Sequence, residues 1–312
     1  MRRNHRSDNR GTDVGDTASA ATAPAHTPAL SFADTRFAYG ERTIVDGVCF
    51  DVAPGELVAL VGMNGCGKST LLKLAAGLLR PASGNVWLQG KAITRLSRRE
   101  AARRVALLHQ SSPPVPGLTV RHLVRQGRYA TRGPFGMLRD GDDEICLRAM
   151  ADAGVTHWAD HPVDALSGGE RQRVRLALVL AQDTPVLLLD EPTTYLDLRH
   201  QLEVLELVAT LRRDRKLTVV MVLHDLGHAA RYAERIIALR AGRVVADGPP
   251  GDIVTPALLR DVFAVAGRVG LDPQRGWPIC YPDSPLDDTP AQDATPATNT
   301  TDHRAQAPEP RP

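Results

Sequence analysis

A glycine-rich loop with a single lysine is the part of this chain whose residue types and spacing most clearly support chemistry. The stretch GMNGCGKST runs from Gly62 to Thr70 and fits the pattern G-x-x-x-x-G-K-[ST]. Glycines let backbone N–H groups converge on phosphate oxygens, and a helix that starts at the loop points its positive end at the same anion. Lys68 adds a charge for the β- and γ-phosphates, and Ser69 offers a hydroxyl to Mg²⁺. The residues expected to bind a nucleotide here are Gly62, Asn64, Gly65, Cys66, Gly67, Lys68, Ser69 and Thr70.

Three acids follow an apolar run later in the chain. The stretch VLLLDEPTTYLDLRHQ contains Asp190, Glu191 and Asp197. Carboxylates are costly beside a buried strand, so their position needs a reason. Asp190 ends the run, where phosphate-loop NTPases place an acid that holds Mg²⁺. Glu191 points the other way at a strand end and can serve an attacking water. A strand-terminal pair of acids is often only the start of a solvated loop, but together with the phosphate loop it indicates hydrolysis.

Short apolar runs predict the elements that must position these residues. The runs at 56–62, 186–190 and 217–224 are apolar almost throughout, which is typical of strands covered on both faces. Helical spacing of leucines follows at 69–80, and a second helical pattern occupies 201–213. Strands that alternate with helices in this way predict βαβ units and a mostly parallel sheet. The strand before the phosphate loop and the helix after it also argue against a chance glycine-rich turn.

A helical insertion is expected in the middle of the chain, at about 97–166, with a Pro/Gly-rich loop at 111–117. Its helical segments are expected at 97–104, 118–126 and 142–153. Farther on, 235–248 alternates around Ala241-Gly242 and predicts a hairpin. Residues 1–28 and 284–312 have too little apolar content to build a core and are expected to be disordered tails.

Composition excludes several other classes of protein. The chain has 312 residues and a net charge of +2, which implies no strong nucleic-acid field. The arginine-rich stretch RLSRREAARR at 95–104 is more typical of a solvated helix face than of a nucleic-acid site. The four cysteines form no CxxC pair, which favours reduced thiols over a disulfide framework or zinc. No signal peptide and no run near the roughly 20 apolar residues of a membrane span is visible, so work at a membrane would need a partner.

The stretch LSGGERQRVRLALVLA at 166–181 resembles the signature motif of ATP-binding cassette ATPases, and it lies between the two nucleotide motifs as in that family. The resemblance covers roughly 29–270. It implies an α/β fold: a P-loop NTPase (RecA-like) core with a mostly parallel sheet, an antiparallel β portion and a helical subdomain at about 97–166. A C-terminal extension at 271–283 would follow. Met63 and Gly227 depart from residues frequent in the family, a Pro and an Asn, and neither removes a ligand.

The resemblance also implies roles for individual residues. Tyr39 would stack on adenine, although a core tyrosine remains an alternative. Gln110 would sense Mg²⁺ and the γ-phosphate, and Glu191 would be the general base. The signature residues would contact ATP held by a second copy, with Asp197 in the loop that crosses the interface. The residues that complete the expected site are Lys68, Gln110, Glu191 and His224 as catalytic groups, Tyr39, Ser167, Gly168, Gly169 and Asp197 as nucleotide contacts, and Ser69, Gln110 and Asp190 for the metal.

Finer similarity lies in DEPTTYLDLRHQLEVLEL, in GLTVRHLVRQGRYA and in the stretch from VLHDLGH onward. These look like the ATPases of ferric-siderophore, haem and cobalamin uptake. The expected function is ATP hydrolysis that energises uptake of an iron chelate, with haem or cobalamin import, an exporter or a non-transport ATPase as alternatives. Expected cofactors are ATP and Mg²⁺. Expected partners are permease subunits, a second copy and, indirectly, a periplasmic or lipoprotein solute-binding protein, with no nucleic acid. The expected location is the cytoplasmic face of the membrane.

Overall fold

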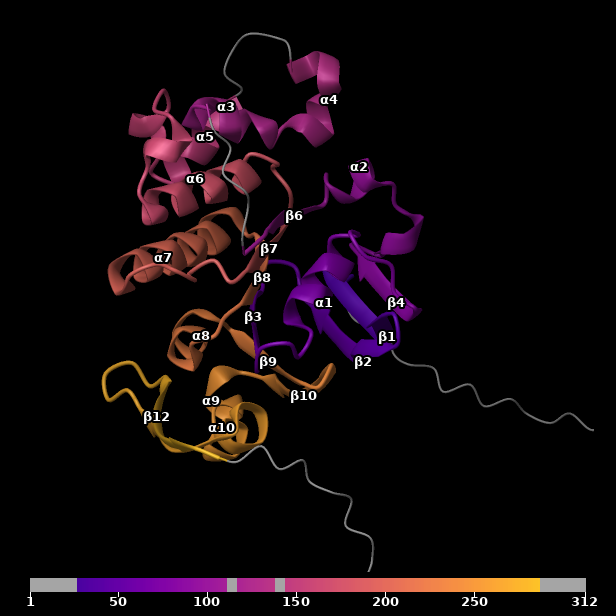
Figure 1. Ribbon diagram of the computed structural model, residues 1–312, viewed down its shortest axis with the longest axis vertical. Coiled ribbons are helices and arrows are strands. Elements are labelled where there is room, and N and C mark those ends of the chain that lie inside the picture. Colours follow the sequence, from indigo (N-terminus) through magenta and orange to yellow (C-terminus); the bar gives the residue numbers. More distant parts are fainter. Residues whose placement is uncertain (1–26, 111–116, 138–143, 287–312) are drawn as a thin grey trace, which may run out of the picture.

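A six-stranded sheet forms the centre of the computed structural model, which describes residues 27–110, 117–137 and 144–286 (Figure 1). Its strand order is β10-β9-β3-β8-β7-β6, and all neighbours are parallel except β10 and β9. The bounds are β3 Leu57–Val61, β6 Val105–Leu108, β7 Val186–Asp190, β8 Thr218–Val222, β9 Arg235–Arg240 and β10 Arg243–Gly248. Every residue of β3, β7 and β8 is buried, as their uniformly apolar runs predict.

The two faces of this sheet pack against different layers. Within β3, Leu57, Ala59 and Val61 join one core cluster, whereas Val58 and Leu60 join the other, because side chains alternate along a strand. The first cluster contains residues of helices α6 Gly168–Leu180, α7 Leu198–Arg215, α8 Leu226–Tyr232 and α10 Pro256–Phe263. The second contains helix α1 Lys68–Ala75 and the strands of a separate antiparallel sheet.

That antiparallel sheet has the order β2-β1-β4-β5 and accounts for the expected antiparallel portion. Its bounds are β1 Leu30–Tyr39, β2 Arg42–Val52, β4 Ser83–Leu88 and β5 Lys91–Ala92. The 3-10 turn η1 Ile93–Arg95 and the short helix α2 Arg98–Ala101 then lead into β6. The predicted hairpin at 235–248 is confirmed as β9 and β10, which turn at Ala241 and Gly242, both with positive φ.

A helical part lies at one end of the molecule (Figure 1). Its elements are α3 Val120–Gln126, α4 Tyr129–Met137, α5 Glu144–Asp152, η2 Thr156–Trp158, η3 Val163–Ala165 and the first turns of α6. The expected range 97–166 began too early, because β6 lies inside it and pairs with β7 in the main sheet. The helical part therefore begins only after β6, and the loop at 111–117 lies outside the described residues except for Gly117.

The C-terminal region holds a hairpin that the sequence did not predict. Strand β11 Val265–Leu271 pairs with β12 Pro278–Pro285, after α9 Pro250–Ile253 and α10. The hairpin crosses the expected boundaries, because the extension at 271–283 begins at the end of β11 and the tail at 284–312 begins inside β12. Apart from a few residues next to the fold, the two expected tails lie outside the described residues. The four cysteines lie within the described residues and form no disulfide, and no helix there is long and apolar enough to cross a bilayer.

Candidate functional site

The phosphate loop connects β3 to α1, and its shape requires glycine at two positions. Gly62 has φ 143, and a Cβ added there would lie 2.2 Å from the carbonyl oxygen of Leu239. Gly67 has φ 109, and an added Cβ would lie 2.8 Å from the carbonyl oxygen of Ile44. Both positions combine a backbone conformation that disfavours side chains with close backbone neighbours. The loop is therefore held tightly against β9 and β2, and its course depends on glycine.

A cavity of about 230 Å³ opens beside this loop. It is lined by Tyr39, Arg42, Ile44, Asn64, Gly65, Gly67, Lys68, Ser69, Thr70 and Glu191. Tyr39 stands half exposed at the end of β1, with its ring packed edge-on against Phe37 at 4.8 Å between ring centres. Gly62 and Cys66 do not line the cavity, since the buried Cys66 side chain belongs to the core cluster that contains α1. Gly62 and Cys66 could therefore contact a ligand only through their backbone groups.

Lys68 lies along the loop rather than away from it. Its Nζ donates to the carbonyl oxygens of Gly62, at 2.7 Å, and of Met63, at 2.9 Å. The side chain is buried, so the loop itself fixes where the positive charge sits. An ammonium group held by two carbonyl groups at the wall of the cavity provides a positioned charge for an anionic ligand.

Ser69 and Asp190 form an oxygen-rich pair below the cavity. The Ser69 hydroxyl donates to Asp190 Oδ1 at 2.9 Å, and Asp190 is buried at the end of β7. Burial raises the pKa of Asp190 above its usual value, the bond from Ser69 opposes that rise, and the nearby Glu191 charge adds to it. A carboxylate and a hydroxyl are ligands that suit Mg²⁺, which takes one or two carboxylates and completes its shell with phosphate and water. The donor set thus fits that ion.

Glu191 is the point on which side chains from three other places converge. Its Oε2 accepts from Gln110 Nε2 at 2.5 Å and from the Thr194 hydroxyl at 3.1 Å, while its Oε1 lies 2.6 Å from His224 Nε2. The backbone of Glu191 has φ 51, which turns it sharply away from Asp190. The carboxylate is almost fully covered, with a side chain only 10% exposed.

Strand register explains this convergence. Leu108 of β6 pairs with Leu189 of β7, and Asp190 pairs with Val222 of β8, so the three strands end level. Gln110 follows β6 by two residues and His224 follows β8 by two residues. Carboxyl ends of parallel strands meet at one edge of a sheet, which is where ligands bind in such folds. The sheet therefore brings together Gln110, Asp190, Glu191 and His224, as expected.

The signature residues form a second cluster. Ser167 caps α6 in a capping box with Glu170, and Gly168 and Gly169 begin the helix. A Cβ added at Gly169 would lie 2.4 Å from the His200 ring, so this glycine lets the ring approach closely. Asp197 caps α7 and accepts from His200 Nδ1 at 2.8 Å, and its bonds with His200 lower its pKa.

The two clusters are distinct within one chain. Ser167, Gly168, Gly169 and Asp197 lie beside one another through His200, and none of them lines the cavity at the phosphate loop. The helix start at Ser167 offers backbone N–H groups that suit an anion. An anion bound in the cavity of the same chain would not lie at this helix start.

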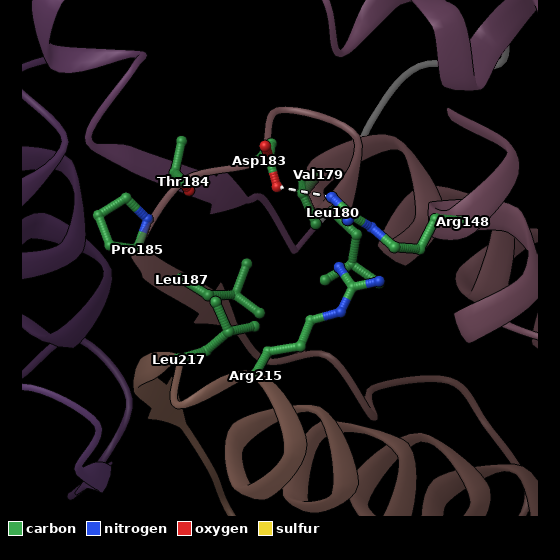
Figure 2. A pocket seen from close by; sticks show the side chains of 9 residues that line it. All are labelled: Arg148, Val179, Leu180, Asp183, Thr184, Pro185, Leu187, Arg215 and Leu217. Atoms are coloured by element: carbon green, nitrogen blue, oxygen red, sulfur yellow. Dashed lines mark hydrogen bonds and ion pairs between the residues drawn. The ribbon is translucent and has the colours of Figure 1, made fainter. Parts of the chain in front are cut away.

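A larger hollow of about 440 Å³ lies at the opposite edge of the sheet, where β7 begins and β8 is about to begin (Figure 2). Its lining includes Val179, Leu180, Leu187 and Leu217 together with two arginines. Arg148 pairs with Asp183 at 3.2 Å, and Arg215 pairs with Asp152. Because its cations are already matched by acids and the phosphate loop is at the other edge, this hollow is not the nucleotide site despite its size.

Comparison with known proteins identifies the family. The profile described as ABC transporter matches residues 45–194. The chain is 43% identical over 251 residues to the iron(3+)-hydroxamate import ATP-binding protein FhuC of Bacillus subtilis (strain 168). The aligned region covers 80% of this chain and 93% of that protein. This chain belongs to the ABC transporter family. It is an ATPase of that family.

Two further relatives and two solved structures extend this result. The ferric enterobactin transport ATP-binding protein FepC of Escherichia coli (strain K12) is 44% identical over 78% of this chain and 90% of its own length. The hemin import ATP-binding protein HmuV of Nocardia farcinica (strain IFM 10152) is 52% identical over 77% of this chain and 83% of its own. The dimeric structure of the bacterial ABC transporter cassette MJ0796 has TM-score 0.63 and 28% identity, covering 70% of this chain and 98% of that one. The structure of cbiO1 from Clostridium perfringens has TM-score 0.65 and 26% identity, covering 73% and 90%.

The structure adds residues to the ABC ATPase site that sequence reasoning missed. Thr194 bonds the Glu191 carboxylate, and Arg42 and Ile44 line the cavity. Gln172 donates to the carbonyl oxygen of Pro192 at 2.8 Å and thereby links α6 to the segment after Glu191. Thr194 lies in the TTYLD stretch, where hydroxyl side chains close to three acids were an available signal. Gln172 and Ile44 carry no such signal, because their contacts arise from tertiary packing.

Proposed function

We propose that this ABC ATPase energises import of an iron chelate, a ferric siderophore, through a separate membrane permease. The observation that carries the hydrolytic part is the convergence of three side chains on Glu191, next to the Ser69–Asp190 pair. The substrate part is supported by relatives such as FhuC and FepC, whose names state iron(3+)-hydroxamate import and ferric enterobactin transport.

In this proposal, ATP binds in the cavity with its phosphates at the loop and its adenine beside Tyr39. Lys68 and the loop N–H groups balance the phosphate charge. Ser69 and Asp190 would hold Mg²⁺, with Gln110 near it, and the ion would neutralise charge on the phosphates. Each carboxylate oxygen has two lone pairs, and among the described residues Oε1 of Glu191 pairs only with His224 Nε2. A lone pair on Oε1 can therefore accept the proton of an attacking water, which makes Glu191 the general base.

A second copy of the chain completes the site in this proposal. Ser167, Gly168 and Gly169 do not line the cavity of their own chain, so in this proposal they would contact the γ-phosphate bound to the partner copy, and Asp197 would lie at the interface between copies. The dimeric MJ0796 cassette supports this arrangement by similarity. The permease would dock on the helical part and the segment after Gln110, and the protein would lie at the cytoplasmic face of the membrane. A periplasmic or lipoprotein solute-binding protein would act upstream of that permease.

Haem is a second candidate substrate. The relative HmuV, named for hemin import, is 52% identical to this chain, a higher identity than FhuC or FepC has. The described site is one for nucleotide, and in this proposal solute specificity would belong to the permease and the binding protein. Uptake measurements must therefore separate the two.

Two experiments test the proposal. Glu191→Gln should bind ATP but hydrolyse it about a thousandfold more slowly, because a positioned general base contributes on the order of 10²–10⁴-fold. In the presence of ATP this variant should accumulate as a dimer, which sedimentation velocity measures. Near-normal turnover would show that Glu191 is not the general base.

In cells, deletion of the gene should abolish uptake of labelled ferric siderophore. The wild-type chain should restore this uptake, and Glu191→Gln should not. Loss of haem uptake alone would select the second substrate, and unimpaired uptake of both, in a strain without a redundant system, would end the import proposal.

A further inference from the structure

Positive charge is concentrated on one stretch of the chain that the ATPase site does not use. Between Ala76 and Leu108 there are seven basic residues and one acidic residue, whereas the whole chain has 38 basic and 36 acidic residues. The seven are Arg80, Lys91, Arg95, Arg98, Arg99, Arg103 and Arg104. The single acid, Glu100, is occupied in the capping box of α2, where it accepts from the Ser97 N–H and hydroxyl at 2.9 and 2.7 Å. Little negative charge is therefore left to balance the cations locally.

The fold brings the segments that carry most of these cations close together. We name Arg80, Lys91, Arg95, Arg98, Arg99 and Arg103 the cationic face, and all six are exposed. A Cβ added at Gly77 would lie 3.2 Å from Ile93 and 3.7 Å from Ala101, which places the end of α1 beside η1 and α2. Figure 1 shows α2 along one side of the molecule, between α4 and β4.

Contacts tie the same surface to the helical part. Arg99 and Arg103 donate from their Nε atoms to the carbonyl oxygen of Ala130, at 2.8 and 3.1 Å. These two arginines help to join α2 to α4. By contrast, Arg80, Lys91, Arg95 and Arg98 make no hydrogen bond or ion pair within the part of the chain that the structure describes, so their charges are available to a partner.

Large apolar side chains border the cationic face. Leu78 is 50% exposed, Trp87 is 37% exposed and Tyr129 is 57% exposed. Leu78 follows α1, Trp87 pairs with Ala92 directly before η1, and Tyr129 adjoins Ala130 at the start of α4. Trp and Tyr beside basic residues are the composition that membrane–water interfaces favour, because an amphipathic ring sits at the level of the headgroups.

We infer that the cationic face binds the surface of an anionic lipid bilayer directly, without the permease. The charges are spread over β5, η1, α2 and the segments on either side of them, as a surface needs, and apolar and aromatic side chains flank them. Basic residues close to an anionic leaflet are attracted by its surface potential, and the attraction falls off within a Debye length of about 8 Å at physiological salt. The inference does not depend on which solute is imported, because it concerns how the ATPase reaches the membrane.

The test uses the full-length protein and vesicles. The wild-type protein should co-sediment with vesicles of phosphatidylcholine and phosphatidylglycerol but not with phosphatidylcholine alone, and added salt should release it. Replacing Arg80, Lys91, Arg95 and Arg98 by Gln should weaken binding on the order of 600-fold, since each basic residue near an anionic surface contributes roughly fivefold. A matched control replaces Arg240, Arg260, Arg268 and Arg275 by Gln, which removes the same charge from exposed positions in β9, α10 and the β11–β12 hairpin. The control should weaken binding only a few-fold.

Each outcome decides the inference. Equal losses in the two quadruple variants would mean that net charge alone is sensed, which overturns it. Absence of wild-type binding to phosphatidylglycerol vesicles would also overturn it. This includes the case in which the protein binds detergent-solubilised permease through the same residues, because the cationic face would then bind an acidic protein segment and not lipid. ATPase activity of each variant reports on folding. If the quadruple variant fails to fold, the double variant Arg95→Gln/Arg98→Gln should still lose roughly 25-fold in vesicle binding.

Discussion

The hydroxyl of Thr194 is expected to position the Glu191 carboxylate for catalysis, and the substitution Thr194→Val tests this. Valine keeps the branched shape and removes only the donor to Glu191 Oε2, which lies 3.1 Å away. A hydrogen bond to a charged group contributes about 1.5–3 kcal/mol, and this distance is long for a hydroxyl donor, so the lower figure applies. Gln110 still holds the same oxygen at 2.5 Å, so the carboxylate loosens without being released.

The expected result is a fall in kcat of about tenfold, because roughly 1.4 kcal/mol corresponds to a factor of ten in rate. The KM for ATP should stay unchanged, since Thr194 does not line the cavity. Steady-state ATPase assays measure both constants, and Thr194→Ser is the matched control, because serine keeps the hydroxyl and loses the methyl group. Wild-type kcat in Thr194→Val would refute the positioning role. An equal loss in Thr194→Ser would refute it as well, since packing and not the hydroxyl would then matter.

Three other predictions concern the loop, the buried acid and the segment after Glu191. Gly62→Ala should abolish binding of a fluorescent ATP analogue, because its Cβ would lie 2.2 Å from the Leu239 carbonyl oxygen; retained binding would show that the loop can move away. Asp190→Asn should raise the Tm of the nucleotide-free protein by a few degrees at neutral pH and abolish hydrolysis. Burial raises the folded-state pKa of Asp190, so the wild type gains stability as pH falls through that pKa toward the ordinary 3.8. The difference in Tm between the wild type and Asp190→Asn should therefore shrink as pH falls, and a constant difference would contradict this. Tyr195 is 92% exposed beside Asp197, so its ring is expected to contact the second copy. In the Glu191→Gln background, adding Tyr195→Ala should weaken ATP-driven dimers in sedimentation, whereas adding Tyr195→Phe should retain them. Equal dimerisation of the two double variants would contradict this.

The sequence predicted best where local pattern and tertiary role coincide. Apolar runs located β3, β7 and β8 because strands covered on both faces have no polar side to show. The antiparallel sheet was expected only from the family resemblance, because the sequence pattern did not locate its strands. The hairpin of β11 and β12 was missed because Pro278, Pro282 and Pro285 interrupt any strand pattern. Three prolines fit a strand whose outer edge stays unpaired, since proline blocks further pairing.

For the site, residue types were predictable but partners were not. Lys68 was expected to reach phosphates, and the structure adds that two carbonyl groups of its own loop hold it. Cys66 belongs to the phosphate-loop pattern, yet its side chain lies in the core. The contact of Gly169 with His200 joins residues far apart in the chain, and no periodicity in the sequence can announce it.

The segment from Asp190 to His200 connects the two clusters, and this gives physical meaning to the spacing of its acids. Asp190 bonds Ser69 at the phosphate loop, whereas Asp197 bonds His200, whose ring lies against Gly169 at the start of α6. Between them, the carbonyl oxygen of Pro192 accepts from Gln172 of α6, and Thr194 bonds Glu191. A shift of α6 when an anion binds at its start would therefore reach the carboxylate of Glu191 through hydrogen bonds within this one segment. Such a connection is a physical route by which a second copy could set the rate of hydrolysis. Because Thr194 bonds Glu191 at the end of this route and does not line the cavity, changes at Thr194 should alter kcat and leave ATP binding intact.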